Sequence, residues 1–177
     1  MVSVPTAKLG INYGANLGDD VTYSGTVSAA MEAVINMCPA FAISQEYYEH
    51  PDFDLARRMA HLTARNILEH GLGPGELLNI NVPAGEPHGV QVTRLGKRIY
   101  RDELKLDAED EDGGRRYWIY GADPGFHDEP GTDLAAVHAG HIAVTPVHFD
   151  LTDVSGLDAL TKYDLARLLA PAAREVQ

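Results

Sequence analysis

The sequence predicts an α/β fold in which a parallel sheet is flanked by helices, with an added β-hairpin arm and a C-terminal helix. Short apolar strands alternate with amphipathic helices in the first half of the chain, the pattern typical of a parallel sheet. Strands with hairpin-like spacing follow, and the last long segment has helical periodicity. The 177 residues can bury one core, so we expect a single domain over residues 1–177.

The first predicted elements surround the stretch "GINYGANLGDDVTYSGT", residues 10–26. A short strand leads into this glycine-rich loop, and Asn12 stands where the strand ends, the usual ligand position in open α/β sheets. A helix is expected to start near Ser24, a suitable N-cap, because apolar residues recur at helical spacing from Val27. This helix must end before Pro39, since the residue preceding a proline is driven toward extended geometry.

The later elements follow in chain order. Residues 52–71 predict an amphipathic helix with acidic residues in its first turn and Gly71 after its end. Predicted strands are "PAFAIS" (39–44), "LLNINVP" (77–83), "GVQVTRLG" (89–96), "RRYWIYG" (115–121) and "GHIAVTPV" (140–147). We expect the core at 9–85 and 132–150, the β arm at 88–122 with an acidic tip at 107–114, and the C-terminal helix at 156–174. Parallel sheets need helices on both faces, and the early elements are few, so the sheet is expected to be incomplete at its N-terminus.

Composition excludes several classes of function. The formal net charge of −12 and the pI near 4.9 oppose a nucleic-acid scaffold or an anionic membrane, both of which require clustered Lys and Arg. Cys38 is the single cysteine, which rules out an intrachain disulfide and a thiolate zinc cluster. The N-terminus has no signal-peptide pattern and no apolar run approaches a membrane span, so we expect a cytoplasmic protein with no membrane partner.

The glycine-rich loop contains no Lys, Arg, His or Cys, yet it is rich in oxygen ligands. It lacks the Gly-Lys-Ser/Thr ending of a P-loop, and its glycines do not have the spacing of the dinucleotide fingerprint. Backbone N–H groups at a helix N-terminus attract anions, and Ser24, Gly25 and Thr26 are placed to supply them. The side-chain oxygen of Asn12 suits Mg²⁺ or Mn²⁺. The same residue types also build ordinary turns, so these residues alone leave a structural loop equally open.

The stretch "GINYGANLGDDVTYSGTVSAAMEA" resembles the signature of the stationary-phase survival protein SurE family. The likeness continues in family order through "PAFAIS", "LLNINVP", "RYWIYG" and "TDLAAVHAGHIAVTPVHFDLT". It implies a Rossmann-like core and a metal-dependent 5'-nucleotidase acting on nucleoside monophosphates. It also implies a homo-oligomer, a dimer or a tetramer, in which the β arm and C-terminal segment are exchanged between subunits.

Carried over by residue, the resemblance makes Asn12 a ligand of the divalent metal and places Asn16, Ser24, Gly25 and Thr26 around the phosphate. The family's remaining metal ligands, an Asp-Asp pair and a serine, are expected in an N-terminal segment that precedes this chain, so no catalytic residue is assigned here. Asp19 and Asp20 follow the metal asparagine in the family pattern, and we interpret them as part of the loop. The start "SVPTAKLGIN" departs from the family strand, which indicates a truncated or split gene product, an artefactual start site or a deliberate fragment.

Three alternatives stay open. The chain is a nucleotidase, a non-catalytic SurE remnant that acts as a binding or assembly module, or a phosphatase for another substrate such as short polyphosphate. The basic residues Arg94, Lys97, Arg98 and Arg101 either form a solvated, ion-paired face or contact a phosphate or a neighbouring subunit. A zinc site at His138, His141 and His148 is not favoured, because a strand separates them and no carboxylate pattern accompanies them.

Overall fold

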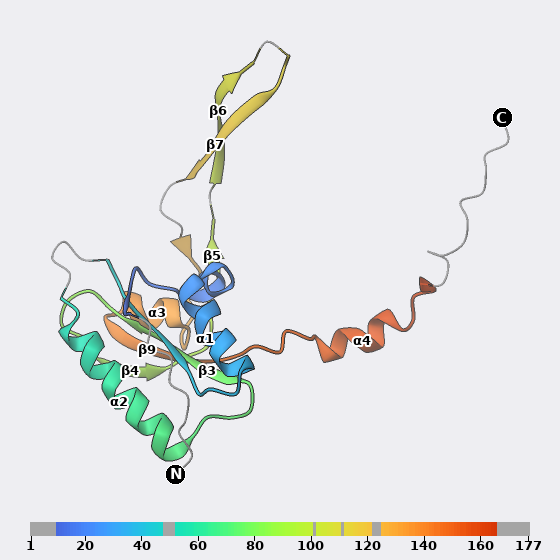
Figure 1. Ribbon diagram of the computed structural model, residues 1–177. Helices are drawn as coiled ribbons and strands as arrows, with labels where there is room; N and C mark the ends of the chain where they lie inside the picture. Colours follow the sequence, from blue (N-terminus) through green and yellow to red (C-terminus); the bar gives the residue numbers. More distant parts are fainter. Residues whose placement is uncertain (1–9, 48–51, 101, 111, 122–124, 166–177) are drawn as a thin grey trace.

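The computed structural model describes residues 10–47, 52–100, 102–110, 112–121 and 125–165. Five strands form a central sheet, which lies in the core of the molecule (Figure 1). The strand order is β1-β2-β3-β9-β4, with β1 (Asn12–Tyr13), β2 (Phe41–Gln45), β3 (Glu76–Val82), β9 (His141–His148) and β4 (Gly89–Val92). Strands β1, β2 and β3 run parallel, as do β4 and β9, whereas β9 is antiparallel to β3. The predicted α/β fold is confirmed, and the sheet is mixed because β9 reverses direction.

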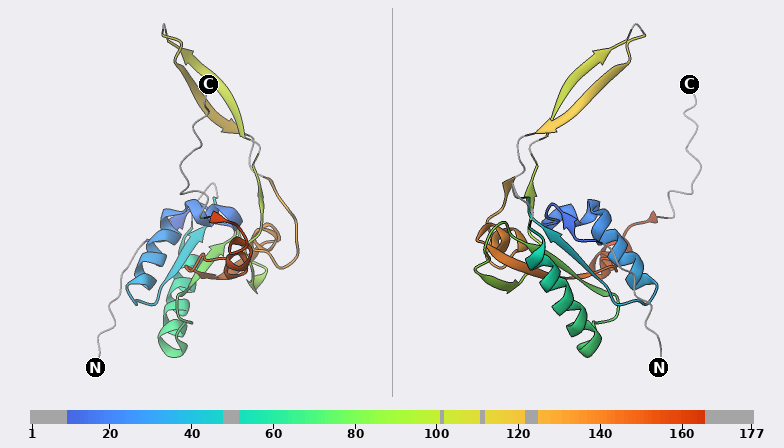
Figure 2. Two further views of the ribbon diagram at one scale, coloured as in Figure 1. Left: turned by 90° about the vertical axis from the view of Figure 1, so that its right-hand side faces the viewer. Right: turned by 60° about the vertical axis from the view of Figure 1, so that its left-hand side comes forward.

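Helices cover both faces of this sheet (Figure 2). The helix α1 (Gly25–Ile35), the 3-10 helix η1 (Gly18–Tyr23) and α3 (Asp133–His138) lie on one face, and α2 (Asp54–His70) lies on the other. Val27 of α1 packs with Leu77, and Ala56 of α2 packs with Ile80, the strand residues pointing to opposite faces. The core is therefore a three-layer arrangement that fixes the strand ends in place.

Helix α1 begins where the sequence predicts. Ser24 has extended backbone angles, φ −78° and ψ 118°, and its hydroxyl accepts a hydrogen bond of 3.1 Å from the Val27 N–H. This confirms Ser24 as the N-cap, since a capping oxygen satisfies one of the N–H groups that have no partner inside the helix. The helix ends at Ile35, before Pro39. Because α1 connects two parallel strands, it starts at the edge of the sheet where β1 ends.

A buried carboxylate holds the loop before η1 against the rest of the core. Asp133 is fully buried and accepts hydrogen bonds from the backbone N–H groups of Gly18 (2.8 Å), Gly96 (2.8 Å) and Leu134 (2.9 Å). Gly18 has φ +54°, and a Cβ there would lie 2.8 Å from the Gly96 carbonyl oxygen. Glycine is thus required at position 18 by both backbone conformation and space.

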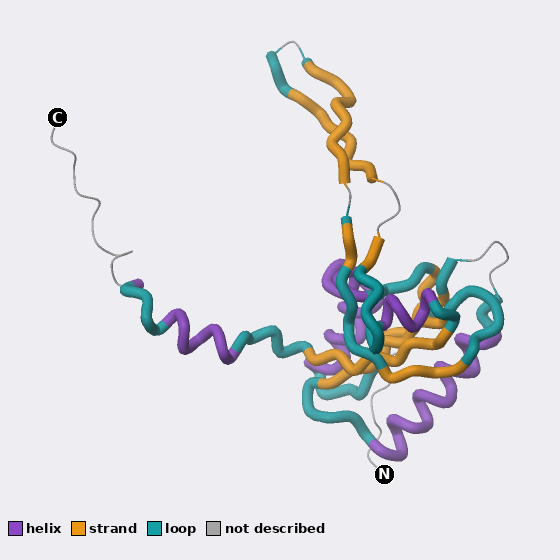
Figure 3. Tube along the Cα trace, turned by 180° about the vertical axis from the view of Figure 1, so that it is seen from behind, coloured by secondary structure: helices purple, strands orange, loops and turns teal. Residues whose placement is uncertain are grey.

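The β arm projects from the core as a two-stranded ribbon (Figures 1 and 3). It consists of β6 (Asp102–Glu109) and β7 (Arg115–Gly121), and the pair β5 (Arg98–Ile99) and β8 (Gly125–Phe126) forms its base. The predicted arm range 88–122 is too long, because β4 joins the central sheet beside β9. The predicted acidic tip 107–114 is also partly wrong, since β6 continues to Glu109 and the turn follows it.

The C-terminal helix α4 (Val154–Leu160) is shorter than the predicted range 156–174. It ends at Leu160 with Thr161 as its C-cap, and residues 166–174 of the prediction lie outside the described residues. No residue of α4 is buried, and a helix this short has little stability in water without tertiary packing. Helical periodicity alone therefore overestimated its length. None of the helices in the described part of the chain is long and apolar enough to cross a membrane.

Candidate functional site

The candidate site starts from a row of polar side chains across three neighbouring strands. Asn12 of β1 is paired in register with Ser44 of β2, and Ser44 with Asn81 of β3. Residues in register on adjacent strands point to the same face, here the face that carries α1. Ser44 and Asn81 are fully buried, whereas Asn12 at the edge of the row is half-buried. The row leads from the sheet interior to the end of β1.

Asn16 is held over this row by four hydrogen bonds. Its side-chain Nδ2 donates to Ser44 Oγ (2.7 Å), and its backbone N–H donates to Asn81 Oδ1 (2.8 Å). Its backbone carbonyl accepts from Asn79 Nδ2 (2.8 Å) and Asn81 Nδ2 (3.0 Å). Burying a polar side chain is costly unless it is hydrogen-bonded. Here Asn16 of the loop is the partner of the buried Ser44, Asn79 and Asn81 side chains. The structure thus brings Asn12 and Asn16 together beside Ser44.

Asn12 has its side-chain amide oriented by the loop. Its Nδ2 donates a hydrogen bond of 2.7 Å to the carbonyl oxygen of Gly14, so the nitrogen is the atom directed at the loop. The side-chain oxygen takes no part in that bond, and it is the atom that a hard divalent cation binds. The geometry of Asn12 is compatible with the predicted ligand role.

The N-terminus of α1 is formed by Ser24, Gly25 and Thr26. The Oγ of Ser24 accepts from Val27, and a hydroxyl that accepts one bond still has its proton to donate. Gly25 and Thr26 occupy the first helical turn, where the backbone N–H groups have no carbonyl partner within the helix. Gly25 is exposed and Thr26 is half-buried. Together these groups form a positively polarised helix end that attracts an anion.

The acidic pair within the loop, Asp19 and Asp20 of η1, is engaged in ion pairs. Asp19 accepts from Lys97 Nζ (2.9 Å) and from the Arg98 backbone N–H (3.0 Å), and these hydrogen bonds hold the pKa of Asp19 below its usual value. Asp20 accepts from Arg98 Nε (2.8 Å) and from the Tyr100 hydroxyl (2.7 Å). The structure therefore directs both carboxylates to the base of the β arm, as expected for residues that shape the loop.

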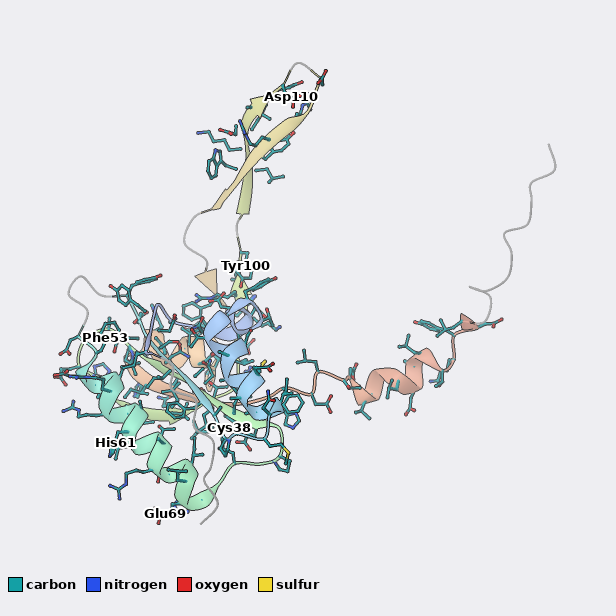
Figure 4. The ribbon with its side chains drawn as sticks, in the orientation of Figure 1. Cys38, Phe53, His61, Glu69, Tyr100 and Asp110 are labelled. Atoms are coloured by element: carbon teal, nitrogen blue, oxygen red, sulfur yellow. The ribbon has the colours of Figure 1, made fainter. Side chains whose placement is uncertain are left out.

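Tyr100 lies at the base of the arm, near η1 (Figure 4). The hydrogen bond that its hydroxyl donates to Asp20 raises the pKa of Tyr100 to about 12, because an ionised phenol would face the carboxylate. The basic residues of this region are occupied in the same way, with Arg94 paired to Glu129 at 2.7 Å. The ion-paired interpretation of the basic cluster holds for Arg94, Lys97 and Arg98, while Arg101 lies outside the described residues.

The three histidines do not converge on a zinc site. His138 packs against the ring of Phe126 with centroids 5.3 Å apart, and His141 packs against His88. His148 accepts from the Asp150 N–H at Nδ1, so its Nε2 donates to the Pro74 carbonyl oxygen. Among the described residues no group of three or more His, Cys, Asp or Glu side chains could hold a metal ion. Among the described residues, the side-chain oxygen of Asn12 is thus the predicted ligand for a divalent cation. These residues do not provide a complete set of metal ligands.

Sequence reasoning missed the residues that support the site, which are Ser44, Asn79, Asn81 and Asp133. A signal for three of them was present, because polar side chains inside short apolar strands require a buried partner. Asp133 follows Thr132, the N-cap of α3, and this pattern predicts a helix start but not the hydrogen bonds to Gly18 and Gly96.

Comparison with known proteins gives consistent results. The family model described as Survival protein SurE matches residues 9–102. The 5'-nucleotidase SurE of Rubrobacter xylanophilus is 44% identical, with 90% of this chain and 64% of the relative covered. That of Chloroflexus aggregans is also 44% identical, with 88% and 63% covered.

A solved structure, the SurE protein from Aquifex aeolicus, superposes with a TM-score of 0.73 at 39% identity and covers 86% of this chain and 62% of its own. The chain spans less than two thirds of the length of these relatives. The match to the family model and the identities over most of the chain agree with the fold and the loop geometry described above. The chain belongs to the SurE family.

Proposed function

We propose that this chain belongs to a metal-dependent 5'-nucleotidase that hydrolyses nucleoside monophosphates to nucleoside and phosphate. The observation that carries the proposal is the arrangement of an amide oxygen donor, Asn12, and the anion-attracting start of α1 at one edge of the sheet. Open α/β sheets bind ligands at the carboxyl ends of their strands. The relatives named 5'-nucleotidase SurE support the reaction class.

In this proposal the chain binds and orients the phosphate. The backbone N–H groups of Gly25 and Thr26, with the hydroxyls of Ser24 and Thr26, donate hydrogen bonds to the phosphoryl oxygens. These donors are held in place before substrate arrives, so they stabilise charge that builds on the phosphoryl group during reaction. Asn16 is held in place by its bonds to Ser44 and Asn81, and in this proposal it lies beside the bound phosphate. We assign no general acid or base among the described residues.

The proposed cofactor is Mg²⁺ or Mn²⁺, and Asn12 is the ligand that the described residues contribute. A divalent cation there supplies the positive charge that the loop lacks, and it polarises the phosphoryl group. Asp19 and Asp20 are not included as ligands, because Lys97 and Arg98 occupy their oxygens.

Replacing Asn12 by alanine is expected to weaken Mn²⁺ binding at least about tenfold, since loss of a group that orients or binds a metal costs that much or more. Calorimetric titration of the chain with Mn²⁺ measures this. Asn36→Ala is the matched control, because Asn36 is the exposed C-cap of α1 and its side chain donates to Glu32 of the same helix. Equal Mn²⁺ affinity in Asn12→Ala and the control would remove Asn12 as a ligand.

The reaction itself is tested by hydrolysis of AMP by the purified chain with Mn²⁺ or Mg²⁺ and with EDTA. Turnover that EDTA abolishes would support metal-dependent hydrolysis by this chain. Absence of turnover from a folded sample would contradict catalysis by this chain. It would favour the alternative in which the chain is a binding or assembly module, provided that phosphate binding persists.

We also propose that the protein is a homo-oligomer. Large apolar side chains on the β arm are exposed, among them Leu104 (69%), Leu106 (47%), Tyr117 (45%) and Trp118 (64%). An isolated two-stranded ribbon is marginally stable in water, and exposed apolar surface of this kind is typical of an interface. Helix α4 adds Val154, Leu157 and Leu160, which are also exposed. A second copy of the chain would cover both surfaces.

Replacing Leu106 by glutamate is expected to shift the protein to a smaller species, because the charge would be buried in the proposed interface. Light scattering coupled to size-exclusion chromatography reports the mass. Leu68→Glu, the same change at an exposed position of α2 outside the arm and α4, is the control that should keep the wild-type mass. A monomeric wild-type chain would contradict the proposal.

A further inference from the structure

Three aromatic side chains gather at the edge of the sheet where the candidate site lies. The rings of Tyr13 and Tyr47 meet edge to face with centroids 4.7 Å apart, and Tyr13 meets Phe53 in the same way at 5.9 Å. Phe53 stands at the start of α2, on the side of the core facing away from α4 (Figure 4). Phe53 is half-buried, but Tyr47 is 69% exposed and Tyr13 is 40% exposed. The two tyrosine rings are therefore exposed to solvent, and Phe53 packs against the ring of Tyr13.

The chain that leads into Tyr47 is held by the neighbouring strands. The Gly14 N–H donates to the Gln45 carbonyl oxygen (2.8 Å), which ties the end of β2 to β1. The Glu46 N–H donates to the Val82 carbonyl oxygen (2.9 Å), and Glu46 Oε2 accepts from the Ala84 N–H (3.0 Å), which ties it to β3. A rigid backbone below an exposed ring lowers the entropy lost when a ligand stacks on that ring. The backbone that precedes Tyr47 is thus held in place, and the Tyr47 side chain remains exposed.

The aromatic cluster and the proposed metal ligand meet at one residue. Asn12 Nδ2 donates to the carbonyl oxygen of Gly14, and Gly14 also lies against Tyr47. Gly14 has φ +110°, and a Cβ there would lie 3.0 Å from the Tyr47 ring. Glycine is required so that the ring can lie directly against the loop. Gly14 therefore links the two features, because it contacts both Asn12 and the exposed ring of Tyr47.

Polar groups lie beside the cluster. A pocket of about 300 Å³ is lined by Gln45, Asp52, Arg58 and Glu86, among others. Gln45 is paired in register with Tyr13, so the two side chains leave the sheet on the same face. Its Nε2 donates to the Val82 and Pro83 carbonyls, and its buried Oε1 has no hydrogen-bond partner among the described residues. This surface offers the donors and acceptors that the edge of a heterocyclic base uses.

We propose that Tyr47 and Tyr13 form a stacking platform for the base of a nucleoside monophosphate, an inference that rests on the proposed nucleotidase function. The phosphate would bind at the start of α1, and the base would lie on Tyr47 across Gly14. Every base has a π-face, so stacking on an aromatic ring tolerates different bases and favours the larger purines. The platform provides affinity for nucleosides. It makes the site prefer nucleotides over phosphomonoesters that lack a base.

Adenosine binding to the full chain tests the platform without requiring phosphate, metal or turnover. Calorimetry on Tyr47→Ala is expected to give about tenfold weaker adenosine binding than wild type, in line with the loss of one base–aromatic stack. Tyr47→Phe keeps the ring and should retain wild-type affinity. Tyr163→Ala removes an exposed tyrosine after α4 and is the matched surface control. Equal affinity of Tyr47→Ala and wild type, or no adenosine binding by wild type, would overturn the proposal.

Hydrolysis separates this inference from the proposed function. For a chain that hydrolyses AMP, the ratio of kcat/KM for AMP to that for ribose 5-phosphate should fall about tenfold in Tyr47→Ala. An unchanged ratio would contradict the platform while leaving the nucleotidase intact. If the wild type hydrolyses neither compound, the proposed function fails, and the adenosine titration still decides whether the aromatic cluster binds a base.

Discussion

Replacing Asp133 by alanine is expected to lower the free energy of unfolding by at least about 3 kcal/mol. The carboxylate is fully buried and accepts from three backbone N–H groups, those of Gly18, Gly96 and Leu134. Each buried donor left without an acceptor costs about 1 to 3 kcal/mol, so the three together account for the estimate. Urea-induced unfolding followed by circular dichroism measures the change.

Two further variants sharpen the Asp133 experiment. Asp133→Asn preserves the shape but turns one acceptor into an N–H₂ donor, so it should lie between wild type and alanine. Asp158→Ala removes an exposed carboxylate of α4 and should be nearly neutral. A loss below about 1 kcal/mol in Asp133→Ala would mean that water or a local shift satisfies the three donors. In that case the hydrogen bonds of Asp133 would not be what holds the loop before η1 against the core.

Replacing Gly25 by proline is expected to reduce AMP hydrolysis about a hundredfold while leaving the protein folded. Gly25 is the first residue of α1, a position that proline favours because its fixed φ suits the helix and no intrahelical bond is lost. The preceding Ser24 already has the extended geometry that a following proline requires. Proline removes one backbone N–H, which is a proposed donor to the phosphate.

Gly25→Ala is the matched control for Gly25→Pro, since it keeps the N–H and its Cβ would meet no atom within 4 Å. Thermal unfolding should show both variants at least as stable as wild type, because each restricts the unfolded chain more than glycine does. Binding of inorganic phosphate should weaken in the proline variant alone. Equal rates and equal phosphate affinity in the two variants would exclude the Gly25 N–H as a donor.

The loop and the helix that follows it could be predicted because their signals are local. Ser24 precedes an apolar periodicity that starts at Val27, and the cap hydrogen bond joins residues three positions apart. The change from apolar to glycine-rich sequence predicts a strand end at Asn12, and β1 ends one residue later, at Tyr13. By contrast, the length of α4 was overestimated, because a short helix depends on packing that periodicity does not report.

Contacts between distant segments account for what the sequence did not predict. Strand β9 lies between β3 and β4, and no local pattern shows that it runs antiparallel to one neighbour and parallel to the other. Asp133 bonds to Gly18 across 115 positions, and Asn81 bonds to Asn16 across 65. Nothing in the sequence near Tyr13 or Tyr47 links the two residues. They form one aromatic surface because the parallel pairing of β1 and β2 brings the ends of these strands together.

Residue spacing alone was therefore sufficient for the α/β class, the start of α1 and the oxygen-rich loop, since each depends on neighbours within a few positions. The tertiary structure decided which polar groups support that loop and which carboxylates are occupied. Asp19 and Asp20 illustrate the difference, because as sequence they are two acidic residues beside a metal-ligand candidate. Folding brings Lys97 and Arg98 to them from about eighty positions away, and these cations take up the oxygens that a metal would need.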